Sequence, residues 1–114
     1  MEHASDIVLD RAAALARLGF EEELFDELVQ SLIERSRAML DEIGEALQTG
    51  DASRVETLSH SIKGAAATLE ANALASSAHR LEMLARAEDL AEAGAAWRAL
   101  TAAVEDLAAA TSGS

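Results

Sequence analysis

Apolar residues recur at steps of three and four through most of this chain, and this spacing constrains the fold more than any other feature. Such steps place side chains on one face of an α-helix, whereas a half-buried strand requires strict alternation. From about Glu21 to Gly50 the recurring residues are Leu24, Phe25, Leu28, Leu32, Met39, Ile43 and Leu47. The inward positions expected in three later segments are Val55, Leu58, Ile62, Ala65 and Leu69, then Leu74, Ala78, Leu81 and Ala85, then Leu90, Ala93, Trp97, Leu100, Val104 and Leu107. The sequence therefore predicts four amphipathic helices.

Capping residues mark where these helices begin and end. An Asp or Asn side chain can accept a hydrogen bond from the first turn of a helix, and glycine readily takes the left-handed conformation that ends one. The expected N-caps are Asp10, Asp51 and Asn72, and the expected C-terminal glycines are Gly19 and Gly50. Asp10 and Gly19 bracket a further short helix over residues 11–18.

The composition fits helices that pack closely in one domain. The chain of 114 residues has no proline and only three aromatic residues, and alanine is abundant. Each apolar stripe must be buried against neighbouring helices, and short connections between helices favour an antiparallel arrangement. We predict an all-α fold, an antiparallel up-down four-helix bundle with a short additional N-terminal helix. It forms a single domain over residues 1–114, ordered from about 8 to 110, with a flexible start and a flexible TSGS tail.

The net charge of −12 restricts the partners of the chain. Nucleic acid and anionic lipid both require a basic surface, so neither is expected to bind. The absence of cysteine excludes disulfides and thiolate metal sites. No apolar run approaches the roughly 20 residues that cross a bilayer, and the start MEHASDIVLD does not resemble a signal peptide. We expect a cytoplasmic monomer.

His60 is the candidate reactive residue. It lies two positions from both Leu58 and Ile62, and a step of two rotates a side chain by about 200° on a helix, so His60 should face water. Lys63, the only lysine of the chain, and Gly64 follow at steps of three and four, so they share its face. The imidazole is largely neutral near pH 7 and can act as a nucleophile. With Lys63 beside it, we expect a locally cationic spot that suits phosphoryl transfer.

Gly64 is unusual because glycine inside an exposed helix costs about 1 kcal/mol relative to alanine. Alanine is common elsewhere in this segment, so the glycine at position 64 indicates a role other than helix formation. We infer that Gly64 leaves space for the active site of a partner protein to close over the imidazole. Ser61 and Ala67 would contact that partner.

The stretch HSIKGAAATL at residues 60–69 resembles the phosphorylation motif of histidine phosphotransfer domains, in which a histidine is followed three and four residues later by lysine and glycine, and then by small residues. The resemblance continues through Ala73, Leu74, Ala78, Leu81 and Glu82, and backward through the acidic segment before the motif. Glu70 departs from the pattern, because many relatives have glycine there.

This resemblance implies a phosphocarrier without kinase activity of its own. His60 would accept the phosphoryl group on the ring nitrogen farther from the backbone, from the aspartate of a receiver domain or from a kinase, and pass it to the aspartate of a response regulator. Lys63 would stabilise the phosphate and Gly64 would provide clearance. No cofactor is expected in this chain; the divalent metal should belong to the receiver, which should dock on the outer faces of the second and third helical segments.

The sequence can also be compared with three other kinds of helical protein. The dimerisation domain of a histidine kinase carries an acidic residue after its histidine and then a proline-containing stretch, whereas Ser61 follows His60 and proline is absent. A metal-binding bundle needs glutamate three residues before histidine, but Thr57 and Ser76 hold those positions. No metal site is therefore expected. A non-catalytic helical adaptor that binds receiver domains remains the alternative.

Overall fold

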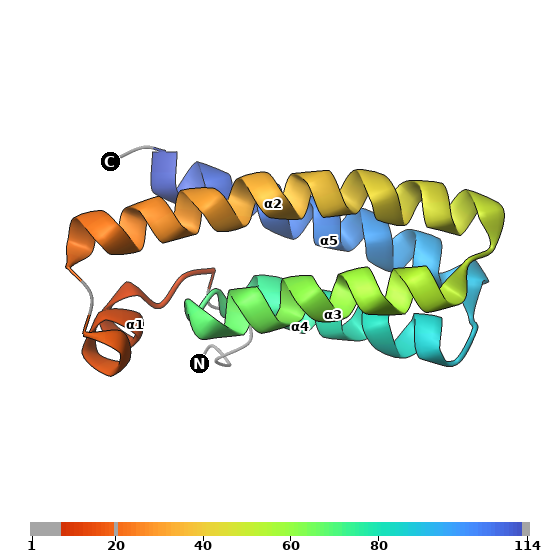
Figure 1. Cartoon of the computed structure of the whole chain (residues 1–114), viewed down its shortest axis with the longest axis horizontal. Helices are drawn as coiled ribbons and strands as arrows, with labels where there is room; N and C mark the ends of the chain where they lie inside the picture. Colours follow the sequence, from red (N-terminus) through yellow and green to blue (C-terminus); the bar gives the residue numbers. More distant parts are fainter. Residues whose placement is uncertain (1–7, 20, 113–114) are drawn as a thin grey trace.

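The computed structural model describes residues 8–19 and 21–112, and every element in this part of the chain is an α-helix. Four long helices alternate in direction, and a short helix lies at one end of the bundle (Figure 1). The helices are α1 (Arg11–Leu18), α2 (Glu22–Thr49), α3 (Ala52–Thr68), α4 (Asn72–Arg86) and α5 (Leu90–Ser112). Each long helix packs on two others, α2 on α3 and α5, and α4 on α3 and α5. The predicted all-α bundle is confirmed.

Four helix ends in the described part of the chain follow the capping residues that the sequence indicated. The Asp10 carboxylate accepts a hydrogen bond from the Ala13 amide at 3.0 Å, and Asp51 accepts one from the Arg54 amide at 3.1 Å. Gly19 and Gly50 end α1 and α2 with φ of +68° and +73°, in the left-handed region that favours glycine. These ends form through contacts within a few residues, which explains why sequence reasoning found them.

The predicted cap at Asn72 is wrong. Ala71 is the N-cap of α4, without a side-chain hydrogen bond, and Asn72 already lies in the first turn. The chain turns tightly here because Glu70 adopts φ of +59° and the Ala71 amide donates to the Ala66 carbonyl at 2.9 Å. Glu70 thus adopts the left-handed conformation that favours glycine, and the chain enters α4 one residue earlier than expected.

The inward face of α3 also differs from the prediction at two positions. The buried residues of this helix and its C-cap are Val55, Ser59, Ile62, Ala66 and Leu69. Ala65 is exposed toward α2 and Leu58 is only partly buried. Ser59 can be buried because its hydroxyl donates to the Val55 carbonyl at 2.7 Å, so this polar group is not left unpaired. Leu24, at the start of α2, is likewise exposed.

Trp97, an expected core residue, is partly buried and packs against the core between α2 and α5. Its indole nitrogen donates to the Leu40 carbonyl at 2.9 Å. The ring lies against Gly44, where an added Cβ would approach Trp97 Cζ2 to 2.8 Å. Gly44 is therefore required by close packing, a role that the sequence did not reveal.

The short helix α1 is held at the end of α3. The Arg17 guanidinium donates to the Thr68 carbonyl at 2.6 Å and to the Glu70 carboxylate at 2.9 Å. The Asp10 amide donates to the Glu70 carbonyl at 3.0 Å. Arg17 thus satisfies carbonyl oxygens that the last turn of α3 leaves without a partner.

Two further expectations concern the ends and the membrane. Helix α5 continues through Ser112, two residues into the segment expected to be flexible, whereas residues 1–7 and 113–114 lie outside the described part. Among the described residues, no helix has both the length and the apolar character needed to span a bilayer.

Candidate functional site

His60 lies near the middle of α3 and points to solvent, as the sequence predicted. Its side chain is 67% exposed. A shallow hollow lies beside it, lined by Glu56, Thr57, His60, Ser61, Glu82 and Arg86. The ring can therefore be reached by a reactive group of another molecule.

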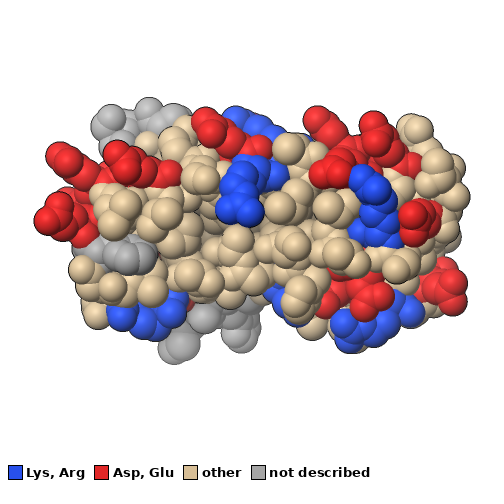
Figure 2. All heavy atoms as spheres, viewed as in Figure 1, with Lys and Arg blue, Asp and Glu red and all other residues tan. Residues whose placement is uncertain are grey.

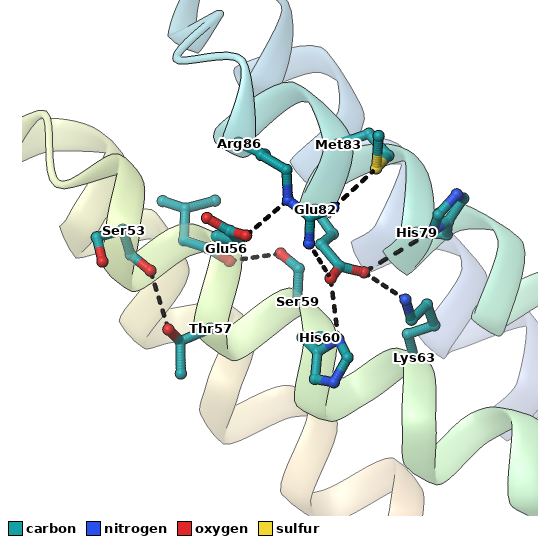
Figure 3. Close-up of polar contacts among 11 residues, drawn as sticks. Ser53, Glu56, Thr57, Ser59, His60, Lys63, His79, Glu82, Met83 and Arg86 are labelled. Carbon is teal, nitrogen blue, oxygen red and sulfur yellow. Dashed lines mark hydrogen bonds and ion pairs between the residues drawn. The ribbon is translucent and has the colours of Figure 1, made fainter.

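A buried carboxylate from the neighbouring helix holds one nitrogen of this ring. Glu82 of α4 is only 2% exposed, and its Oε2 lies 2.9 Å from His60 Nδ1. Figure 3 shows one ring nitrogen directed at Glu82 and the other pointing away from it. An ionised carboxylate can only accept hydrogen bonds, so Nδ1 carries the proton. In the neutral ring, Nε2 then keeps a free lone pair on the solvent side.

Other charged groups surround the same carboxylate (Figure 3). Lys63 Nζ lies 2.6 Å from Glu82 Oε1, Arg86 Nη2 lies 3.1 Å from Oε2, and His79 Nδ1 lies 3.8 Å from Oε1. The pKa of Glu82 is lowered from 4.5 to about 2, mainly by the hydrogen bond from Lys63, with His60 adding to the effect and burial opposing it. Glu82 therefore stays ionised at neutral pH and fixes the tautomer of His60.

The expectation of a locally cationic spot is wrong. Lys63 is 29% exposed and is paired with Glu82. Arg86 also donates to Glu56 at 2.8 Å, so the cluster contains two cations and two carboxylates and is neutral when the histidines are neutral. The charge of Lys63 is already balanced before any phosphate arrives.

The sequence pointed to Glu82 only as part of the family resemblance and indicated no role for it. Its burial depends on Lys63 and His60 of α3, which lie 19 and 22 residues before Glu82 in the sequence. No local pattern reveals such distant partners. A weaker signal was available, because His79 and Arg86 stand three residues before and four after Glu82, where helix neighbours meet. That spacing indicates a carboxylate surrounded by cations.

The other predicted site residues lie on the exposed side of α3. An added Cβ at Gly64 would meet no atom within 4 Å, and Gly64 has ordinary helical φ, so neither packing nor backbone conformation requires glycine. Ala67 is exposed one turn further along the same face. Ser61 is also exposed and faces α2.

A groove runs between α2 and α3 beside His60. Two adjoining hollows form it and share Leu32, Arg35 and Ala65. Its other lining residues are Leu28, Ser31, Ser36, Met39, Ser61, Ile62, Thr68 and Leu69. Figure 2 shows this face as a largely uncharged band with acidic groups gathered toward its two ends. Its apolar floor has the character of a protein-docking surface.

The described residues also bear on metal binding. Within residues 8–19 and 21–112, no group of three or more His, Asp or Glu side chains is placed to hold a metal ion. The Glu82 carboxylate is already paired with Lys63 and Arg86.

Comparison with known families agrees with this geometry. The sequence model of the Hpt domain, the histidine phosphotransfer domain, matches residues 27–110. The chain belongs to this family. The Hpt match spans α3 and α4 entirely and so includes both His60 and Glu82. Membership gives the chain a histidine phosphotransfer role in a phosphorelay, as a phosphocarrier that works with receiver domains.

A solved structure supports the same assignment for this Hpt domain. The present chain is similar to the crystal structure of histidine-containing phosphotransfer protein B from Pseudomonas aeruginosa PAO1, with a TM-score of 0.82 and 25% sequence identity. The similarity covers 91% of this chain and 90% of that one. No match was found among curated protein sequences.

Proposed function

We propose that this Hpt domain accepts a phosphoryl group on Nε2 of His60 from the aspartyl phosphate of a receiver domain, or from a kinase, and passes it to the aspartate of a response regulator. The observation that carries the proposal is the hydrogen bond between His60 Nδ1 and the buried Glu82 carboxylate. It leaves Nε2 as the nucleophile on the exposed side of the ring.

The transfer needs no group beyond those of the two proteins and the metal of the receiver. The Nε2 lone pair attacks phosphorus, the bond from phosphorus to the aspartate oxygen breaks, and the departing carboxylate keeps the electron pair. The phosphorylated ring retains its Nδ1 proton and becomes cationic, and Glu82 stabilises that charge. The same steps in reverse deliver the phosphoryl group to an acceptor aspartate.

Lys63 and Gly64 would serve the approach of the phosphoryl group. Lys63 is part-exposed on the same face, so its long side chain can turn from Glu82 toward a phosphoryl oxygen as negative charge arrives. Gly64 leaves open space above the helix for the receiver. Ser61 and Ala67 would contact that receiver. The divalent ion that phosphoryl transfer requires would come from the receiver, and the relay would work with a monomer in the cytoplasm.

Transfer from a labelled receiver tests this proposal. The chain is incubated with phosphorylated receiver domains, and label on it is measured for the wild type, His60→Gln and His79→Gln. We expect the wild type and His79→Gln to be labelled and His60→Gln to remain unlabelled. His60→Gln should fold normally, because its amide can still donate to Glu82 and surface changes usually alter stability by about 0.5 kcal/mol or less.

Two other outcomes would contradict the proposal. Labelling from ATP alone would reveal a kinase activity that the proposal denies. A receiver that binds the wild type tightly without transferring its phosphoryl group would favour the adaptor function.

A further inference from the structure

Among the residues that the structure describes, Arg35 is the only charged one that lines the groove between α2 and α3. It is exposed on α2 and borders both hollows. Ser61 lines the same hollow as Arg35 and also lines the hollow beside His60. A molecule that covers the imidazole and extends over the groove would therefore reach the guanidinium of Arg35.

Arg35 also lacks the partners that other arginines of the chain have. Across residues 8–19 and 21–112 its side chain makes no hydrogen bond or ion pair, as is also true of Arg80 and Arg98, whereas the remaining arginines each pair with a carboxylate: Arg11, Arg17, Arg37, Arg54 and Arg86. The residues three and four positions away on α2 are Ser31, Leu32, Ala38 and Met39, none of which is acidic. In a chain with 21 acidic residues, this guanidinium is left free in an uncharged groove.

A free guanidinium in a docking surface restricts the chemistry of the partner. When a protein covers the groove, Arg35 loses water, and a charge that is buried without a partner is strongly unfavourable. A carboxylate opposite Arg35 removes this penalty, because it can accept two parallel hydrogen bonds from the planar guanidinium. The rest of the chain is strongly acidic and repels acidic partners. An attraction confined to Arg35 would therefore also fix the position in which the partner docks.

We propose that Arg35 determines which receiver domains this chain serves, by pairing with a carboxylate on the rim of the receiver's active site. The inference rests on the proposed function and adds the feature by which a receiver is selected. Arg35 does not touch the reacting atoms, so it should affect docking and leave the chemical step unchanged.

The test compares Arg35→Glu with Arg98→Glu, which makes the same change in charge on α5, a helix that lines no part of the groove. Transfer rates are measured against receiver concentration, with the phosphorylated receiver that labels the wild type fastest. We expect Arg35→Glu to lower kcat/KM at least about tenfold through KM, with the rate at saturation unchanged, and to weaken the dependence on salt. Arg98→Glu should stay within about threefold of the wild type.

Charge reversal on the receiver identifies the partner residue. Single Asp→Arg or Glu→Arg changes around the receiver's active site are tested with both forms of the chain, and one of them should restore transfer to Arg35→Glu while weakening transfer to the wild type. The inference is overturned if no such change restores transfer, or if Arg35→Glu behaves like Arg98→Glu. A wild-type chain that receives no phosphoryl group from any receiver would overturn the proposed function as well.

Discussion

The imidazole of His60 is fixed at one nitrogen and open at the other, and the reason lies in a single buried carboxylate. Glu82 accepts from Nδ1 at 2.9 Å and cannot donate, so the reactive lone pair is confined to Nε2. Hydrogen bonds from Lys63 and His60 lower the pKa of Glu82 and keep it ionised despite its burial. The reactivity of an exposed residue thus depends on one that is 2% exposed.

The ionisation of Glu82 makes the stability of the fold depend on pH. Its pKa falls from 4.5 in the unfolded chain to about 2 in the folded one, so its contribution is complete above about pH 4.5 and is lost as the pH falls toward 2. Glu82→Gln cannot titrate, so its melting temperature should decline less than that of the wild type over this range. Thermal melts from pH 6 to pH 2 compare the two proteins, and parallel curves would contradict the role assigned to Glu82.

Gly64→Ala separates stability from transfer. The added methyl group meets no atom within 4 Å, and alanine favours a helix by about 1 kcal/mol, so the melting temperature should rise or stay unchanged. Phosphotransfer should slow, because displacement of the incoming phosphoryl group by about 1 Å can reduce the rate roughly a hundredfold. A thermal melt and a single-turnover assay are run on the same variant. Lower melting with unchanged transfer would mean that Gly64 serves the backbone.

At the scale of the elements, the contact of α2 with α5 depends on Gly44, another glycine inside a long helix. At Gly44 an added Cβ would lie 2.8 Å from Trp97 Cζ2, and the indole is held by its hydrogen bond to Leu40. Gly44→Ala should therefore destabilise the fold by about 1–3 kcal/mol, the usual cost of overpacking. Chemical denaturation measures the change. In a Trp97→Leu background the same substitution should be neutral or stabilising, and an equal loss there would exclude the proposed clash.

The attachment of α1 depends on Arg17. Loss of its hydrogen bonds to Thr68 and Glu70 in Arg17→Ala should let α1 open more often without unfolding the bundle. A partly exposed ion pair contributes about 1 kcal/mol or less, so amide exchange in α1 should accelerate by up to about fivefold. Hydrogen exchange followed by mass spectrometry measures this, with α5 as the internal reference. Unchanged exchange in α1 would show that other contacts hold it.

The elements differ in how far the sequence alone could predict them. Both ends of α1, the end of α2 and the start of α3 were predictable because a local cap or a glycine decides each of them, as at Asp51 and Gly50. The start of α4 was not, because it depends on the left-handed turn at Glu70. His60 could be identified from its motif and its outward position. Glu82 could not, because only the packing of α3 against α4 brings its partners together.

At the scale of the whole molecule, the bundle holds two helices in fixed register so that one presents the nucleophile and the other orients it. The groove between α2 and α3 lies next to the same imidazole, and in the proposed relay it would give a receiver a place to dock. That relay would therefore use a reactive nitrogen, a fixed tautomer and a docking surface that the bundle brings together, with the metal supplied by the receiver.

The position of the phosphoryl group on the phosphorylated chain tests this relay chemistry most directly. The chain is labelled with ¹⁵N-histidine, phosphorylated by a receiver domain and studied by ³¹P and ¹⁵N NMR, which distinguish the two ring nitrogens. We expect phosphorus bonded to Nε2 of His60, with the proton retained on Nδ1 against Glu82. Phosphorus on Nδ1 of His60, or on another histidine, would contradict the mechanism.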